Sequence, residues 1–307
     1  MGRPRSMHVS VDPRGELSTC NFVLQALLSA GCTIRFERLD APSHSLGMAI
    51  SSGGRRIWID ARDGGGMDSA PAEWADVYAK VNIEPGIVDV VPLGPLFGLQ
   101  LWSLPAGYLK LVALVRGGAH PRKALAHLRF QGITRLPIED YVPGSSEPDF
   151  VFLRSRFWTG KHSAVNASRA RFLRSLEGMD LRIDAEFASE RIDLATYLEH
   201  TRRSAVVFNA PAVHQCLGWK LGEFLALGKA IISVPLNREL PMPLVHGEHI
   251  HFIADDVDAM REAVALITRD DAYRRRLEVG ARRWFDEVLS PVSVAQRVLG
   301  AELRAEP

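Results

Sequence analysis

The strongest constraint on the fold is a regular alternation of strand-like and helix-like patterns that begins near residue 149. Five short apolar runs have strand character, namely DFVFLRS, LRIDAEF, AVVFNAP, KAIISVP and HIHFI. Segments with helical periodicity separate the first four of them, at residues 166–176, 194–203 and 219–227. Parallel strands need long crossover connections, which helices commonly supply. The pattern therefore predicts an α/β fold with a parallel sheet covered by helices on both faces.

Two more helices are expected after these strands. Asp255 or Asp256 can cap the first of them, and its apolar positions fall on one helical face: Val257, Met260, Val264 and Ile267. The second begins near Asp271 and carries a run of arginines, which is typical of a solvated face.

The N-terminal half opens with a strand at 7–11, a helix at 18–30 and a strand at 33–38. This βαβ order places the loop at 12–16 at the carboxyl edge of a sheet, where ligands bind in such folds. The apolar stretch at 90–115 is interrupted by several prolines and glycines, and we expect loops and short elements there.

A chain of 307 residues is long enough for two domains of roughly 150 residues each. Turn-forming residues are concentrated at 141–149, in YVPGSSEPD. We place the boundary in this segment, with domains at 1–145 and 146–307.

Composition excludes several classes of protein. Lys and Arg number 37 against 36 Asp and Glu, so no overall field attracts nucleic acid. Three scattered cysteines without CxxC spacing predict neither a disulfide framework nor a structural zinc site, and they fit a reducing compartment. No apolar run of about 18 residues and no signal-peptide pattern is present, so we expect a soluble, cytoplasmic protein. Dehydrogenase, serine-hydrolase and P-loop glycine motifs are also absent.

One long stretch carries a family resemblance. It reads HQCLGWKLGEFLALGKAIISVPLNRELPMPLVHGEHIHFI and is followed by DDVDAM and DDAYRRRLEVGARRWF. These segments resemble the donor-binding domain of GT-B glycosyltransferases of the group 1 or family 4-like superfamily. The resemblance covers roughly 150–290 and is clearest at 219–253. It implies two Rossmann-like domains facing across a cleft, with the acceptor bound by the first, a nucleotide-sugar bound by the second, and a last helix that returns to the first.

Retaining members of that family carry a Glu-x7-Glu motif, in which the second acid binds the ribose of the donor. Glu223 stands at the second position, whereas the first is occupied by Gln215. The resemblance therefore assigns Glu223 to the nucleotide, and the departure at Gln215 leaves the stereochemical outcome open. His214, which begins the matching stretch, is a further candidate for donor contact.

Elementary physical chemistry supports a donor site at the same helix. A helix start offers unpaired N–H groups and a positive dipole end, both suited to a diphosphate. Gly218 precedes the helix and allows close backbone approach, Lys220 can meet phosphate charge, and Glu223 can accept hydrogen bonds from ribose hydroxyls. The alternative is that Lys220 and Glu223 are ordinary surface partners three residues apart.

A second candidate group follows the first strand of the C-terminal half, in FLRSRFWTGKH. GT-B donor domains often carry an Arg and a Lys at this spacing, which neutralise the diphosphate leaving group. Arg156 and Lys161 match it and would stabilise the charge that develops on the departing diphosphate. The alternative is that both are exposed loop cations.

The segment HGEHIHFI contains His246, His249 and His251, which could in principle hold zinc. No carboxylate or cysteine cluster supports such a site, so no metal and no organic cofactor is expected. His246 is instead a candidate for contact with the donor.

Asp12 is the candidate general base, because it follows the first strand in the half expected to hold the acceptor. An Asp before Pro13 is also a common turn residue, which is the competing interpretation.

These observations predict transfer of a glycosyl group from a nucleoside-diphosphate sugar to an acceptor hydroxyl. The alternatives are a sugar-nucleotide epimerase of the same fold and a catalytically silent nucleotide-binding subunit. No nucleic-acid partner is expected. Apolar residues at 96–104 keep an acceptor groove or a peripheral membrane contact open, although Phe97 and Trp102 are more simply core residues.

Overall fold

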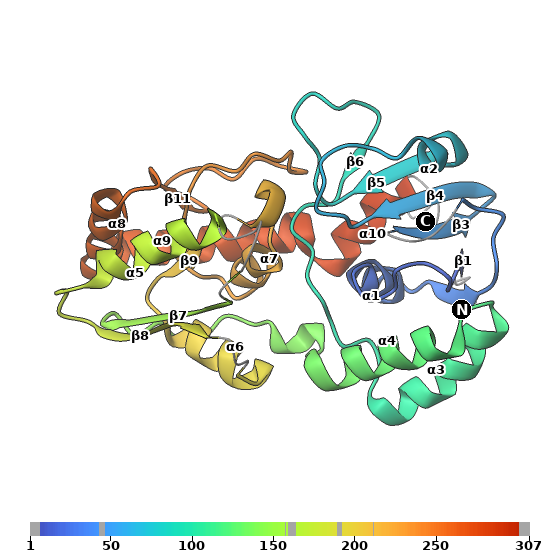
Figure 1. Ribbon diagram of the computed structural model, residues 1–307, viewed down its shortest axis with the longest axis horizontal. Helices are drawn as coiled ribbons and strands as arrows, with labels where there is room; N and C mark the ends of the chain where they lie inside the picture. Colours follow the sequence, from blue (N-terminus) through green and yellow to red (C-terminus); the bar gives the residue numbers. More distant parts are fainter. Residues whose placement is uncertain are drawn as a thin grey trace, which may run out of the picture. The chain divides into compact units, whose positions relative to one another are not determined.

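The computed structural model describes residues 7–42, 47–156, 158, 164–188, 192–210 and 212–300. The chain divides into two compact units (Figure 1). Unit 1 comprises Met1–Ile138, Glu239–Pro241 and Val288–Pro307, and unit 2 comprises Glu139–Arg238 and Met242–Glu287. Each unit combines parallel strands with helices, so the predicted α/β class is confirmed.

Unit 1 is built on a six-stranded sheet with the order β2-β1-β3-β4-β5-β6. Its strands are β1 (His8–Val11), β2 (Thr33–Phe36), β3 (Gly47–Ser52), β4 (Arg55–Asp60), β5 (Val77–Lys80) and β6 (Val91–Pro92). Strand β3 is antiparallel to both of its neighbours, β1 and β4. This sheet is therefore mixed, unlike the all-parallel sheet of a Rossmann-like unit.

A two-glycine turn explains the antiparallel strand. Gly53 and Gly54 join β3 to β4 and have φ angles of 55° and 85°. Positive φ at both central positions is the requirement of a tight β-hairpin, and glycine meets it without steric cost. Because β4 is again parallel to β1, the carboxyl ends of β1, β4 and β5 lie at the same edge of the sheet.

The helices of unit 1 are α1 (Asn21–Ser29), α2 (Ser69–Trp74), α3 (Leu104–Arg116), α4 (Pro121–Thr134) and α10 (Pro291–Leu299). Helix α10 packs against α1, and α3 packs against α4. On one face of the sheet, Ala49, Trp58 and Tyr78 form a small cluster next to Trp74 of α2. A 3-10 helix, η1 (Ile138–Asp140), and a π-helical turn, η4 (Phe285–Leu289), lie where the chain passes between units.

The expectation of loops and short elements at 90–115 was wrong for its second half, which forms the 13-residue helix α3. Pro105 lies in the first turn of α3, where the backbone N–H that proline lacks would have no intrahelical partner. Phe97 is buried in the core, as the simpler interpretation of this region held. Among the described residues, no helix combines the length and apolar character that a membrane span requires.

Unit 2 contains two groups of parallel strands. The first has the order β11-β10-β9, and the second pairs β7 with β8. The strands are β7 (Phe150–Arg156), β8 (Arg182–Ala188), β9 (Val207–Asn209), β10 (Ile231–Ser233) and β11 (His251–Phe252). The groups are adjacent, because the Ala205 amide donates to the Phe150 carbonyl at 2.7 Å.

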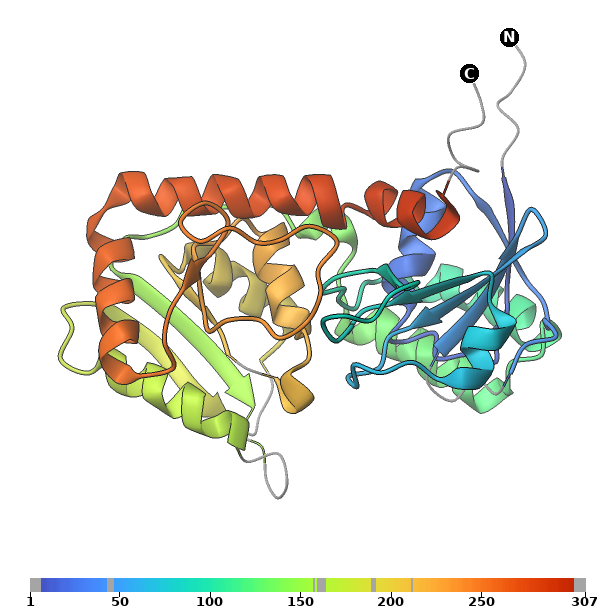
Figure 2. The same ribbon diagram turned by 90° about the horizontal axis from the view of Figure 1, so that it is seen from above.

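The helices of unit 2 are α5 (Ala164–Leu176), α6 (Leu194–Arg203), α7 (Trp219–Ala226), α8 (Val257–Arg269) and α9 (Asp271–Trp284), with a 3-10 turn, η3 (Val213–Gln215), before α7. Helices α5 and α8 pack side by side, and α8 leads directly into α9 (Figure 2). In the core beneath them, the rings of Phe172 and Phe208 are stacked with centroids 4.6 Å apart. Asp256 caps α8 by accepting a hydrogen bond from the Ala259 amide.

Candidate functional site

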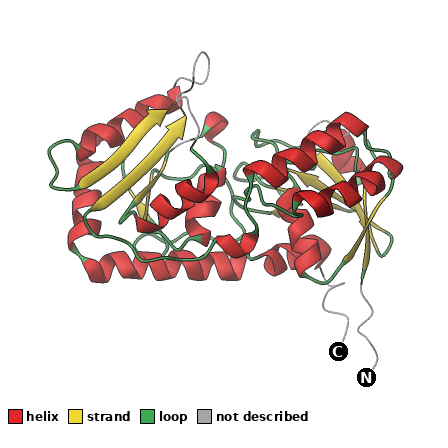
Figure 3. Ribbon diagram, turned by 90° about the horizontal axis from the view of Figure 1, so that it is seen from below, coloured by secondary structure: helices red, strands yellow, loops and turns green. Residues whose placement is uncertain are grey.

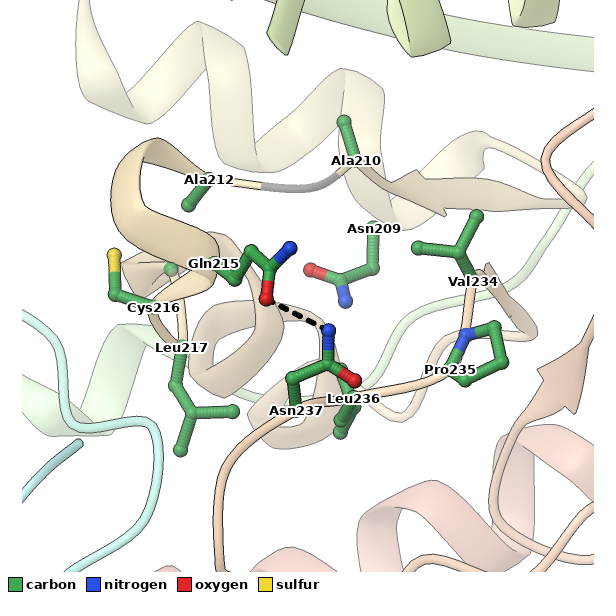
Figure 4. Close-up of a pocket in the computed structure, with 11 residues that line it drawn as sticks. Asn209, Ala210, Ala212, Gln215, Cys216, Leu217, Val234, Pro235, Leu236 and Asn237 are labelled. Carbon is green, nitrogen blue, oxygen red and sulfur yellow. Dashed lines mark hydrogen bonds between the residues drawn. The ribbon is translucent and has the colours of Figure 1, made fainter. Parts of the chain in front are cut away.

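A cavity of about 270 Å³ lies in unit 2 where β9 and β10 end and α7 begins (Figure 4). Three parts of the chain line it: Asn209, Ala210 and Ala212 at the end of β9 and just beyond it, residues 215–218 before α7, and residues 234–237 after β10. The carboxyl ends of parallel strands, next to a helix N-terminus, form the usual ligand edge of an α/β unit. The βαβ order alone is enough to bring the carboxyl ends of these strands and the N-terminus of the helix to the same edge.

The polar side chains at the cavity are carboxamides rather than charged groups. Asn237 donates from Nδ2 to Oε1 of Gln215 at 2.8 Å, and Figure 4 shows these two side chains pointing toward one another. Asn209 donates from Nδ2 to Oγ of Ser233 at 2.9 Å. Carboxamides both donate and accept hydrogen bonds, so this lining suits a ligand that carries hydroxyl groups.

The loop that presents Gln215 has an unusual backbone. His214 and Gln215 adopt consecutive positive φ angles of 57° and 55°. Non-glycine residues rarely occupy this left-handed region, and each such residue costs on the order of 1–2 kcal/mol. Arg238 stabilises the loop by donating from Nη2 to the His214 carbonyl at 2.6 Å. Strained backbone of this kind is concentrated at ligand sites.

The N-terminus of α7 opens onto the cavity. Gly218 is both its N-cap residue and part of the cavity lining, and no side chain caps the helix there. The first turn of α7 contains no acidic residue, so the positive end of its dipole is not offset by a carboxylate of its own. Backbone N–H groups in this arrangement bind anions such as phosphate.

Glu223 and Lys220 lie deeper in α7, and neither is among the residues that line the cavity. Glu223 is 4% exposed. Lys220 donates from Nζ to the Arg154 carbonyl on β7, and its ammonium lies 5.4 Å from the ring centroid of Tyr197 on α6. The ammonium of the half-buried Lys220 therefore contacts β7 and α6 in this structure, and its proposed contact with phosphate stays a prediction.

Burial and neighbouring charges shift the pKa values of Lys220 and Tyr197. Burial lowers the pKa of Lys220 to about 8, the negative charge of Glu223 opposes that shift, and the positive charge of Arg169 adds to it. Burial also raises the pKa of Tyr197 well above its ordinary value, and the charge of Glu223 acts in the same direction. Glu223 is thus a buried acid beside the half-buried Lys220 and Tyr197.

Arg156 is the last residue of β7, where its backbone pairs with Ala188. The proposed role of its side chain, and that of Lys161, lie outside the described residues. Arg156 therefore lies at the carboxyl end of β7.

The histidine segment forms a turn held by its own imidazoles. Nδ1 of His246 accepts from the Phe252 amide at 3.0 Å, and Nδ1 of His249 accepts from the Val245 amide at 3.0 Å. His251 bonds to the hydroxyl of Tyr273 at 2.6 Å, and burial lowers its pKa to about 4. His246 does not line the cavity, and within the described ranges no three His, Cys, Asp or Glu residues converge as metal ligands.

Asp12, at the carboxyl end of β1 in unit 1, is completely buried. Its Oδ1 accepts from the backbone N and Nε of Arg14, both at 3.0 Å. Its Oδ2 accepts from Nη2 of Arg14 at 2.6 Å and from the Leu39 amide at 2.9 Å. Both carboxylate oxygens are therefore committed within the protein, which favours the turn interpretation of Asp12 over the general base.

The same Asp-x-Arg arrangement recurs at the end of β4. Oδ1 of Asp60 accepts from the backbone N of Arg62 at 2.9 Å, and Oδ2 accepts from Nη2 of Arg62 at 2.7 Å, from the hydroxyl of Tyr78 at 2.6 Å and from Nζ of Lys80 at 2.8 Å. Burial opposes ionisation of Asp60, but hydrogen bonds from Arg62, Lys80 and Tyr78 outweigh it and lower the pKa of the carboxyl. Asp60 and Lys80 are both completely buried.

Sequence reasoning did not identify Asn209, Asn237 or the second Asp-x-Arg corner. A signal was present for each, because every one lies at the carboxyl end of a strand predicted in the correct place, or a few residues after it. What the sequence did not show is which of these polar residues pair with each other and which border a cavity.

No family model matches this chain, and no curated protein matches it. Among solved structures, it is similar to a TarM mutant from S. aureus, described in complex with fondaparinux, α-GlcNAc-glycerol and UDP, at 12% identity and a TM-score of 0.41. That match covers 54% of this chain and 37% of TarM. A glycosyltransferase from Rickettsia africae ESF-5 matches at 10% identity and a TM-score of 0.47, over 82% of this chain and 71% of that chain. At these values, the function of this chain has to be inferred from its own site.

Proposed function

We propose that this protein is a glycosyltransferase that binds a nucleoside-diphosphate sugar in unit 2 and transfers the glycosyl group to an acceptor hydroxyl. The observation that carries the proposal is the cavity at the ends of β9 and β10, which the uncapped N-terminus of α7 enters at Gly218. A positive helix end beside a cavity with a carboxamide lining suits a ligand that is anionic at one end and rich in hydroxyls at the other.

In this proposal, the backbone N–H groups after Gly218 bind the diphosphate. Glycosyl transfer expels the nucleoside diphosphate from an oxocarbenium-like centre, so fixed dipoles aimed at the leaving group stabilise the charge that develops. The carboxamides of Asn209, Gln215 and Asn237 would bind sugar hydroxyls. The cavity of about 270 Å³ has room for part of such a donor.

Glu223 is proposed to bind the ribose, as the family resemblance implies. Its carboxylate lies in the second turn of α7, next to Lys220 and Tyr197. Burial makes each hydrogen bond to this charged group worth roughly 1.5–3 kcal/mol, so its loss should be measurable in nucleotide affinity. Unit 1 is proposed to bind the acceptor.

The first experiment is calorimetric titration of uridine, guanosine, adenosine and thymidine diphosphates into the wild type, Glu223→Gln and Glu262→Gln. Glu262 is an exposed glutamate on α8 of the same unit and serves as the matched control. We expect one nucleotide to bind at micromolar concentration, Glu223→Gln to weaken it at least about tenfold, and Glu262→Gln to leave it unchanged.

A second titration separates ribose recognition from a general effect of a buried substitution. The 2′-deoxy form of the preferred nucleotide lacks one hydroxyl, so the wild type should bind it more weakly and Glu223→Gln should no longer distinguish the two forms. If the variant keeps the full preference for ribose, Glu223 does not bind the ribose.

Turnover distinguishes the rival functions. Formation of an altered sugar nucleotide without any acceptor would indicate an epimerase, and nucleotide binding with no turnover on any acceptor would indicate a silent subunit. Absence of binding by every nucleoside diphosphate would contradict all three proposals.

A further inference from the structure

The charges of this chain are balanced overall but not along its length. Between residues 90 and 138 the sequence contains no Asp or Glu. The cations in this segment are Lys110, Arg116, Arg122, Lys123, Arg129 and Arg135. A local excess of positive charge in a chain with a net charge of +1 needs a local explanation.

This segment contains α3, and α3 is poorly buried for a helix of its apolar composition. Only Gly107 and Leu114 are buried in it. Leu109 is 79% exposed, Tyr108 58% and Val112 53%, and Leu104 is also exposed. These four residues fall on one side of the helix, because they are spaced four, five and eight residues after Leu104. Exposed contiguous apolar side chains mark interaction surfaces.

Helix α4 packs directly against α3, and Figure 3 shows the two long helices of this unit side by side. The exposed residues of α4 include three cations, Arg122, Lys123 and Arg129, and no acidic residue, and Ile133 is 64% exposed. On α3, Lys110 and Arg116 are exposed next to the apolar side chains. We call α3 and α4 together the α3–α4 hairpin.

We propose that the α3–α4 hairpin docks this protein on a lipid bilayer that contains anionic lipids. An amphipathic helix with large apolar side chains on one face and Lys and Arg beside them lies in the bilayer interface, where the apolar face enters the acyl boundary and the cations attract acidic headgroups. The absence of acidic residues from 90 to 138 favours this partner over a second copy of the chain, because two copies would bring the same positive charge together.

The inference is independent of the proposed donor site, since every residue that carries it belongs to unit 1. It also differs from the segment that the sequence suggested. Leu96, Phe97 and Leu99 are buried in the core, and the exposed apolar surface begins at Leu104.

Co-sedimentation with phosphatidylcholine vesicles, prepared with and without phosphatidylglycerol, tests the proposal. The wild type should bind the vesicles that contain phosphatidylglycerol at least about tenfold more tightly than neutral vesicles, and added salt should weaken this binding. Leu109→Glu with Val112→Glu should lower the partition coefficient at least about tenfold, because two apolar anchors become charged.

Val279→Glu is the matched control, since Val279 is an apolar residue on helix α9 that is 66% exposed. It should partition as the wild type does. Thermal unfolding of each variant confirms that the fold is retained, and charge reversal at Lys110 and Arg116 provides a second test that does not alter the apolar anchors.

Two results would overturn the proposal. One is equal binding of the wild type and the double variant to vesicles that contain phosphatidylglycerol. The other is a wild-type dimer in sedimentation equilibrium that Leu109→Glu with Val112→Glu converts to monomer, without vesicle binding by either form.

Discussion

At the carboxyl ends of β4 and β5 in unit 1, charged side chains are buried against one another, whereas at the ends of β9 and β10 in unit 2 neutral carboxamides border a cavity. Asp60 and Lys80 are fully buried register partners, joined at 2.8 Å. Asn237 and Gln215 are joined at the same distance, yet both line open space.

The difference follows from the cost of burying charge. A buried carboxylate or ammonium is tolerated only when it is paired and hydrogen-bonded. The charged side chains at this edge of unit 1 must therefore form hydrogen bonds with one another. Carboxamides carry no net charge and can exchange their mutual hydrogen bonds for bonds to a ligand at little cost. The buried Asp60 and Lys80 of unit 1 therefore bind each other, and the neutral edge of unit 2 is the one suited to receive a ligand.

Removing the carboxylate of Asp60 should give the largest effect. Asp60→Ala leaves Lys80 buried without its partner, and we expect the free energy of unfolding to fall by about 3–5 kcal/mol. Urea unfolding followed by circular dichroism measures this change.

Asp76→Ala is the control for Asp60→Ala. Asp76 accepts from the guanidinium of Arg56 in the same bidentate manner, at 3.2 and 2.8 Å, and from its backbone N at 2.8 Å, but both side chains are exposed. Its removal should lower the free energy of unfolding far less than removal of Asp60, because exposed ion pairs contribute little to stability. Similar losses for the two variants would mean that burial does not distinguish the two ion pairs.

The two units can also be compared through a buried lysine in each. Lys80 of unit 1 donates to a carboxylate, whereas Lys229 of unit 2 donates to neutral acceptors. Its Nζ donates to Oγ of Ser146 and to the Arg202 carbonyl, both at 2.6 Å. Burial lowers the pKa of Lys229 from 10.5 to about 8, with Glu278 opposing this shift and Arg274 adding to it. Between these two pH values the unfolded chain holds more protons, so the free energy of unfolding should rise with pH by roughly 2–3 kcal/mol.

Urea unfolding across that pH range, for the wild type and Lys229→Met, measures the effect. The variant should show a smaller rise, to which Lys220 still contributes because its pKa is also lowered to about 8. An identical rise in both proteins would mean that Lys229 keeps its ordinary pKa in the fold.

Asp12→Asn separates the two interpretations of Asp12. Asparagine can accept at one oxygen only, whereas Asp12 accepts at both Oδ1 and Oδ2. A loop-holding role predicts a loss of about 2 kcal/mol in unfolding free energy, with acceptor-dependent turnover largely retained. A general base predicts the reverse, a fall in turnover of about 10²–10⁴-fold with little change in stability.

The fold could be predicted best where local pattern and tertiary structure agree. Helix α6 has the predicted bounds, Leu194–Arg203, because an Asp cap and an amphipathic period both specify it. Helix α3 was missed because the prolines and glycines of the 90–115 stretch suggested breaks, although Pro105 lies where a helix tolerates proline. The mixed sheet of unit 1 was missed because the Gly53–Gly54 turn was not interpreted as a hairpin.

The candidate site could be predicted only in part. The position of the α7 N-terminus follows from local sequence, since Gly218 precedes a clear amphipathic helix. The pairing of Asn237 with Gln215 joins residues 22 apart, and the position of Lys220 depends on Tyr197 and on the carbonyl of Arg154. Such contacts depend on how strands and helices pack, which no local pattern specifies.

Gln215→Glu should give the smallest effect, and one that is opposite in sign for stability and for binding. Gln215 lies three residues before Gly218, and a carboxylate near the positive end of α7 should raise the unfolding free energy by about 0.5 kcal/mol. The same charge competes with a diphosphate for the same N–H groups, so we expect nucleoside-diphosphate affinity to fall about threefold, and less at high salt. Urea unfolding and calorimetry on one preparation measure both quantities. If the substitution instead strengthens nucleotide binding, the diphosphate does not lie at the N-terminus of α7, and the neutral edge of unit 2 has to be assigned to a different part of the donor.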